Sequence, residues 1–154
     1  MECKQIHINM SSPNLINICV DCIENGEISG RIFHCYSREP EEFANIIHLL
    51  NRMEVVFDSI SFPQASTKPR YFVEPEKAPK AKLKKELDQK EVIRHTGKLA
   101  TFVTCVKFRQ NSAWQGELSW IERGETYLFS STLEFIKLID NALAEASDLG
   151  QCKN

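Results

Sequence analysis

The sequence predicts an α+β fold in which an internal duplication of one β-hairpin and helix unit gives antiparallel sheets covered by two helices. Three observations predict it. Residues 15–57 match residues 101–143 without a gap when the chain is compared with itself, and self-similarity of this kind marks a repeated structural unit. Both segments begin with two runs of alternating apolar residues around a turn, as half-buried hairpins do. Both end in apolar residues three and four apart, which share one face of a helix.

The two predicted hairpins are defined by their turns and by the side chains that alternate toward the core. Asn25-Gly26 tolerates positive φ at both central positions of a type I′ turn. Asn111-Ser112 is the weaker equivalent in the second copy. The residues expected to face the core are Ile16, Ile18, Val20, Cys22, Ile28, Gly30, Ile32 and His34, and then Phe102, Thr104, Val106, Phe108, Trp114, Gly116, Leu118 and Trp120.

A helix is predicted to close each unit, over residues 43–57 and 133–143. Ser131 and Glu134 have the spacing of a capping box before the second helix. The two helices need an apolar surface to cover, and the core-facing side of a sheet supplies it.

The second copy has room for a third strand at Glu125–Phe129. In the first copy, Pro40 and the acidic run Glu39–Glu42 argue against the equivalent strand, because proline cannot donate to a ladder. Gln5–Met10 is the alternative for that sheet edge.

The chain is predicted to have three parts that together form one globular domain. Residues 1–61 form the first unit, residues 62–97 a proline- and lysine-rich linker, and residues 98–154 the second unit. Each unit alone is too small to hold a sufficient core. Residues 72–90 are expected to be solvated, with a helical turn near Leu83–Leu87. The lysines that mark the linker are Lys77, Lys80, Lys82, Lys84, Lys85 and Lys90.

Charge and hydropathy exclude some classes of protein. The net charge of −2 is nearly neutral, which argues against a general nucleic-acid coat protein. No apolar run approaches the ~20 residues needed to cross a bilayer, so we expect a cytoplasmic protein without a membrane partner. Cysteines stay reduced in that compartment. All six cysteines of the chain are therefore interpreted as reduced thiols: Cys3, Cys19, Cys22, Cys35, Cys105 and Cys152.

Two segments carry a resemblance to other proteins. They are Phe62–Thr67, which reads FPQAST, and Phe108–Glu117, which reads FRQNSAWQGE. At these positions the chain resembles a group of small uncharacterised proteins common in clostridial gut bacteria. The resemblance covers both units and skips the linker. It implies a bacterial origin, and it implies no activity, ligand or catalytic residue.

The sequence offers no clear catalytic constellation. Cys19 and Cys22 have the spacing of a redox pair or of half a zinc site, but a second pair is lacking. Residues three apart on a strand are also expected to point to opposite faces. Neither a G-x-S-x-G elbow nor a phosphate-binding glycine loop is found. We therefore predict a protein that is not an enzyme and has no catalytic residue, metal or cofactor. An enzyme, the third hypothesis, would need a deep pocket lined with paired titratable groups.

The sheet face opposite the helices is expected to be polar, either solvated or a binding platform. The two tryptophans are expected on the other side, as core or interface residues. The members of the polar face are Asn17, Asp21, Ser29, Arg31 and Phe33 in the first copy, and Lys107, Arg109, Gln115, Glu117 and Ser119 in the second.

These observations favour an adaptor or regulator that binds an unidentified protein partner through a sheet edge, the polar face or the tryptophan region. The alternative is a single-stranded nucleic-acid-binding protein that uses the polar sheet face and the linker lysines. A homodimer is left open. The candidate binding residues are Arg31, Phe33, Lys107, Arg109, Gln115, Trp114 and Trp120.

Overall fold

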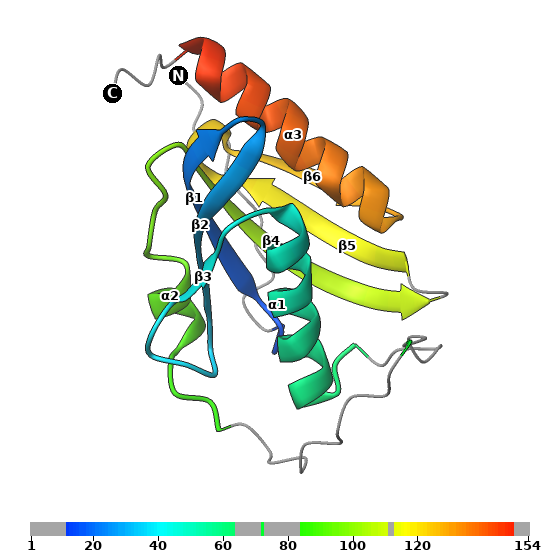
Figure 1. Cartoon of the computed structure of the whole chain (residues 1–154). Coiled ribbons are helices and arrows are strands. Elements are labelled where there is room, and N and C mark those ends of the chain that lie inside the picture. Colours follow the sequence, from blue (N-terminus) through cyan, green and yellow to red (C-terminus); the bar gives the residue numbers. More distant parts are fainter. Residues whose placement is uncertain (1–11, 64–71, 73–83, 111–112, 150–154) are drawn as a thin grey trace.

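The computed structural model describes residues 12–63, 72, 84–110 and 113–149. These residues form one six-stranded antiparallel sheet in the order β3-β2-β1-β4-β5-β6. Figure 1 shows the two main helices lying across one face of this sheet. The elements are β1 (Ile16–Glu24), β2 (Glu27–His34), β3 (Glu41–Phe43), α1 (Ile46–Ile60), α2 (Gln89–Val92), β4 (Ala100–Gln110), β5 (Ala113–Trp120), the 3₁₀ turn η1 (Ile121–Arg123), β6 (Glu125–Phe129) and α3 (Thr132–Leu149). The predicted α+β class is confirmed.

The main core lies between the sheet and the two helices. The central strands β1 and β4 pair with each other, so the two halves of the chain share one sheet. Apolar residues at every second position of these strands pack against α1 and α3, as period-two alternation predicts. The fully buried members include Ile16, Ile18, Val20, Ile32, Leu49, Met53, Phe57, Phe102, Val106, Phe135 and Ile139.

The two halves have the same order of elements and the same strand register. A β-bulge interrupts the first hairpin between Val20 and Cys22, and another interrupts the second between Val106 and Phe108. The position opposite each bulge is a glycine, Gly30 against Val20 in the first hairpin. All of these positions are related by the 86-residue offset found in the sequence.

Each bulge shifts the alternation of side chains by one residue, because an extra residue on one strand moves all later side chains to the other face. Cys22 therefore pairs with Ser29, and Phe108 pairs with Gln115, on the face away from the helices. The expectation that Cys22 and Phe108 face the core was wrong. Arg109 pairs with Trp114 on the helix side, so its predicted place on the open polar face was also wrong.

The first half does contain a third strand. β3 pairs with residues 30–32 of β2, so the expectation against a strand here was wrong. Pro40 precedes the first paired residue, and its missing N–H therefore costs no ladder bond. The alternative edge strand, Gln5–Met10, lies outside the described residues.

The end of the predicted linker packs on the sheet. Residues 84–90 are mostly exposed, as expected, but the helical turn lies at Gln89–Val92, and residues 84–87 of the expected turn are not helical. Leu83 lies outside the described residues. The backbone N–H groups of Glu86 and Leu87 both donate to the carbonyl of Cys35. We call residues 84–99 the covering segment, because its Leu87, Val92 and His95 pack on the first half of the sheet, on the face opposite α1 and α3.

Candidate functional site

The structure separates the seven candidate binding residues into three groups. Arg31 and Phe33 lie under the covering segment. Lys107 and Gln115 lie on the same sheet face, in the second half. The remaining three lie on the helix side: Arg109, Trp114 and Trp120.

Phe33 and Arg31 take part in contacts within the chain. The ring of Phe33 stacks on His95 of the covering segment with centroids 3.8 Å apart, and Phe33 is buried. Arg31 Nε donates to Asp21 Oδ2 at 3.0 Å. Burial alone would raise the pKa of Asp21, but the hydrogen bonds from Arg31 and from the Lys98 N–H outweigh it and lower that pKa. Both predicted residues therefore hold the covering segment in place.

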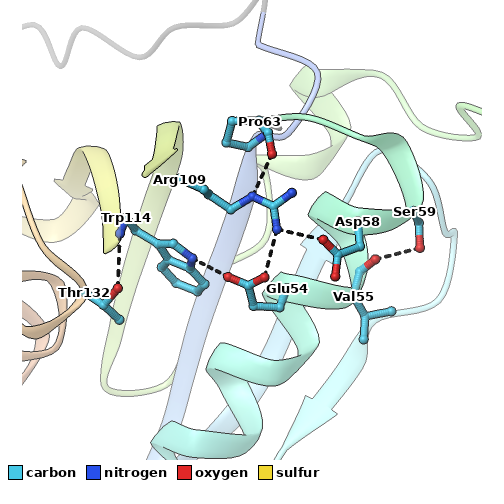
Figure 2. A network of polar contacts seen from close by, with 8 residues as sticks. All are labelled: Glu54, Val55, Asp58, Ser59, Pro63, Arg109, Trp114 and Thr132. Atoms are coloured by element: carbon cyan, nitrogen blue, oxygen red, sulfur yellow. Dashed lines mark hydrogen bonds and ion pairs between the residues drawn. The ribbon is translucent and has the colours of Figure 1, made fainter. Parts of the chain in front are cut away.

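The buried Arg109 is the centre of a polar network that joins the second hairpin to α1, with the partly exposed Glu54 and the exposed Asp58 as its carboxylates (Figure 2). Its guanidinium Nη1 donates to Glu54 Oε2 and to Asp58 Oδ1, both at 2.8 Å, and its Nε donates to the Pro63 carbonyl at 2.7 Å. The indole N–H of Trp114 donates to the second oxygen of Glu54. The network joins both sequence segments that carry the resemblance, since Pro63 belongs to one and Arg109 to the other.

This network is suited to hold elements together. Only 4% of Arg109 is exposed, and two carboxylates offset its charge, as a buried guanidinium requires. Trp114 is also buried, between Phe57 of α1 and Phe135 of α3. Trp120 is buried as well, which confirms the expectation that both tryptophans belong to the core. Strict alternation did not predict the network, because the bulge turns Arg109 inward.

The exposed part of the sheet lies in the second half. Phe108 is 54% exposed and Leu128 is 76% exposed, and both point away from the helices according to their strand pairing. Lys107 Nζ lies 2.9 Å from Glu117 Oε1 on the same face, so these two opposite charges form an ion pair. We call this surface the β4–β6 face and define it by Lys107, Phe108, Gln115, Glu117 and Leu128.

The sequence patterns did not predict that two of these residues, Phe108 and Leu128, belong to the exposed face. Leu128 could have been found, because alternation in β6 places it opposite to the buried Phe129. The exposure of Phe108 depends on the bulge, for which Gly116 inside β5 was the available signal.

The bulge also places Cys19 and Cys22 on one face, since they pair with Arg31 and Ser29, which are two residues apart on β2. The prediction that these cysteines point to opposite faces was wrong. Both are free thiols. Burial raises the pKa of the Cys19 thiol to about 12, whereas Cys22 is exposed. In the described part of the chain, no three His, Cys, Asp or Glu side chains are grouped in a way that would bind a metal ion.

This contrast predicts selective alkylation. In the native protein at pH 8, iodoacetamide should modify Cys22 on the order of 100-fold faster than Cys19, because only an accessible thiolate reacts. Peptide mapping by mass spectrometry after short pulses gives the rate at each cysteine. The same pulses in guanidinium chloride are the control and should remove the difference. Equal native rates at the two residues would contradict the burial of Cys19.

Comparison of the chain with family models, curated proteins and solved structures finds no match. Of the helices that the structure describes, none is both long and apolar enough to span a membrane.

Proposed function

We propose that the protein is a non-catalytic adaptor or regulator that binds a segment of a partner protein on the β4–β6 face. The single observation behind this proposal is the exposure of two large apolar side chains, Phe108 and Leu128, on an antiparallel sheet. Exposed apolar surface with a polar border is typical of protein-interaction sites. Lys107, Gln115 and Glu117 supply that border.

The first half supports the choice of occupant, because there the chain covers the same sheet face with its own covering segment. Leu87 and Val92 of that segment pack on Cys19, Phe33 and Cys35. Asn17 Nδ2 donates to the carbonyls of Val92 and His95, both at 2.8 Å. An irregular segment therefore binds this kind of face through apolar side chains and side-chain-to-backbone hydrogen bonds. We infer that the partner presents a segment of the same character to Phe108 and Leu128.

The proposal includes the duplication predicted from the sequence. The matching bulges, the glycine opposite each bulge and the common 86-residue offset support descent of both halves from one β-hairpin, strand and helix unit. Under this interpretation the β4–β6 face lies on the side of the sheet that the covering segment occupies in the first half, although Phe108 and Leu128 correspond to Cys22 and Glu42, which are exposed.

No contact in residues 12–63, 84–110 or 113–149 favours the nucleic-acid alternative. The three basic residues of the sheet that it used are each paired with carboxylates: Arg31 with Asp21, Lys107 with Glu117, and Arg109 with Glu54 and Asp58. The linker lysines that the structure describes are exposed, and they are Lys84, Lys85 and Lys90. Lys77, Lys80 and Lys82 of the linker lie outside the described residues.

Selection of random 12-residue peptides against the full chain tests the proposal. We expect enriched peptides with a common apolar residue, and we expect Phe108→Ser and Leu128→Ser each to weaken the best peptide by about tenfold or more, as loss of a central apolar contact does. Fluorescence anisotropy measures the affinities. Val55→Ser is the matched control, since Val55 is 62% exposed but lies on α1, and it should leave affinity unchanged.

Two results would overturn the proposal. One is the absence of enriched peptides, or enrichment of peptides that bind the Phe108→Ser and Leu128→Ser variants with full affinity. The other is binding of a single-stranded oligonucleotide that falls steeply with salt and is weakened by Lys107→Ala, which would support the alternative.

A further inference from the structure

A second surface lies on the opposite side of the sheet, in the groove between α1 and α3. The groove forms an open pocket of about 450 Å³ beside the turn of the first hairpin. The apolar part of the wall is aliphatic, and polar side chains complete the lining. The apolar residues are Ile28, Ile46, Ile47, Ile136, Ile139 and Leu143, and the polar ones are Glu27, Asn45, Lys137 and Asp140. Cavities of about 300–1,000 Å³ with an apolar wall and a few polar groups are typical of small-molecule sites.

In the second half, a tryptophan stands at the position that corresponds to Ile28, one of the residues that line this cavity. Ile28 pairs with Ile23 next to the first hairpin turn, and Trp114 pairs with Arg109 at the same place in the second hairpin. The indole of Trp114 lies between the two helices, 5.5 Å from the ring of Phe57 and 5.7 Å from that of Phe135, both measured between centroids. Around the first hairpin the corresponding residues of β2, α1 and α3 are smaller.

The size difference follows from the sequence offset. Ile28 stands in place of Trp114, Leu143 in place of Phe57, and Leu49 in place of Phe135. The first two of these smaller side chains line the cavity. The groove is therefore open where the second half is filled by an indole ring and its aromatic neighbours.

The polar partner of the indole also has a counterpart. The N–H of Trp114 donates to Glu54 of α1 (Figure 2), and the residue at the corresponding position of α3 is Asp140, which lines the cavity. Ile23 stands where Arg109 stands in the second half, so the arginine that neutralises Glu54 has no equivalent at this end. Asp140 is thus an exposed carboxylate acceptor at the rim of the groove, and Lys137, one turn earlier on α3, is the cation that lines the same pocket.

We propose that this groove binds a free small molecule that contains an indole ring, with the ring N–H donating to Asp140. The aliphatic wall takes up the two fused rings, and the carboxylate provides charge complementarity to the N–H dipole. The site lies on the helix side of the sheet, so it is independent of the β4–β6 face, and either proposal can fail alone.

Titration of the full chain with indole, followed by methyl NMR, tests this site. We expect shifts at the isoleucine and leucine methyls of the groove and a Kd on the order of 100 μM, as the size of the ligand allows. 1-Methylindole has the same rings without the donor, and it should bind about tenfold or more weakly, because a site built for a hydrogen bond rejects the analogue that lacks it.

Two variants and one control locate the interaction. Asp140→Leu should reduce indole affinity to that of 1-methylindole and leave 1-methylindole unaffected. Ile28→Trp introduces the side chain that the second half has, and should abolish indole binding while raising Tm. Val55→Trp adds the same ring on α1 outside the cavity lining, and should leave indole binding unchanged.

Three outcomes would overturn the inference, and all of them are measured on the wild-type chain. They are the absence of methyl shifts at millimolar indole, equal binding of indole and 1-methylindole, and tighter binding of N-acetyltryptophanamide than of indole. The last result would assign the groove to a tryptophan side chain of a partner protein instead of a free indole compound.

Discussion

The double substitution Glu54→Ala and Asp58→Ala is expected to destabilise the protein by about 3 kcal/mol, because it leaves a buried guanidinium without a counter-charge. Arg109 is 4% exposed and would retain only the Pro63 carbonyl among the partners described above. Trp114 would lose the acceptor of its indole N–H at the same time. Urea unfolding monitored by circular dichroism gives the free energy of unfolding.

The control for this prediction is an exposed ion pair. Glu145→Ala breaks the contact of 2.9 Å between Glu145 and Arg123, and should cost less than about 1 kcal/mol, as surface pairs do. Adding Arg109→Met to the double variant should recover much of the lost stability, since an apolar side chain needs no counter-charge. A double variant no less stable than Glu145→Ala would show that the network does not hold α1 to the hairpin.

Replacement of Gly30 or Gly116 by alanine is expected to destabilise the protein by about 3 kcal/mol or more, at the upper end of overpacking effects. An ideal Cβ at Gly30 would lie 2.0 Å from the Cys19 carbonyl oxygen, and one at Gly116 would lie 2.1 Å from that of Cys105. Both obstacles are backbone atoms of the neighbouring strand. A methyl group therefore forces the two strands of the hairpin apart at the bulge.

Gly26→Ala is the control that separates the clash of a methyl group with the neighbouring strand from the cost of a left-handed backbone at alanine. Gly26 has a φ of +77° and no heavy atom within 4 Å of its ideal Cβ, so alanine there should cost only about 1–2 kcal/mol through the left-handed backbone. Thermal and urea unfolding of the three variants measure the difference. If Gly30→Ala and Gly26→Ala cost the same, the close approach of the strands at the bulge is not the reason for the glycine.

Local patterns in the sequence were sufficient to predict most of the elements. The Asn25-Gly26 turn has positive φ at both residues, 53° and 77°, as predicted for a type I′ pair. The two helices begin within three residues of their expected starts, at Ile46 and Thr132. The expected cap before α3 forms, with Ser131 Oγ accepting from the Glu134 N–H at 3.1 Å. These features depend on residues close together in the chain.

The candidate site was harder to predict, because it depends on where a strand inserts one extra residue. Apolar residues continue across both bulges, from Val20 to Cys22 and from Val106 to Phe108. Strict alternation therefore assigned the wrong faces to Phe108 and Arg109. The two glycines opposite the bulges were a signal, since glycine inside a strand often marks a bulge or a close backbone approach. The path of the covering segment over Phe33 depends on contacts distant in sequence, such as the stacking on His95.

The extra residue of each bulge forms an ion pair with the returning strand, and the signs are reversed between the halves. Asp21 pairs with Arg31, whereas Lys107 pairs with Glu117 at the corresponding places. Two hairpins this alike risk exchanging strands while the chain folds. A crossed arrangement, with β1 against β5 and β4 against β2, would set Asp21 beside Glu117 and Lys107 beside Arg31, and like charges across a strand pair repel. The reversed charges thus let each strand distinguish its own hairpin partner from the other.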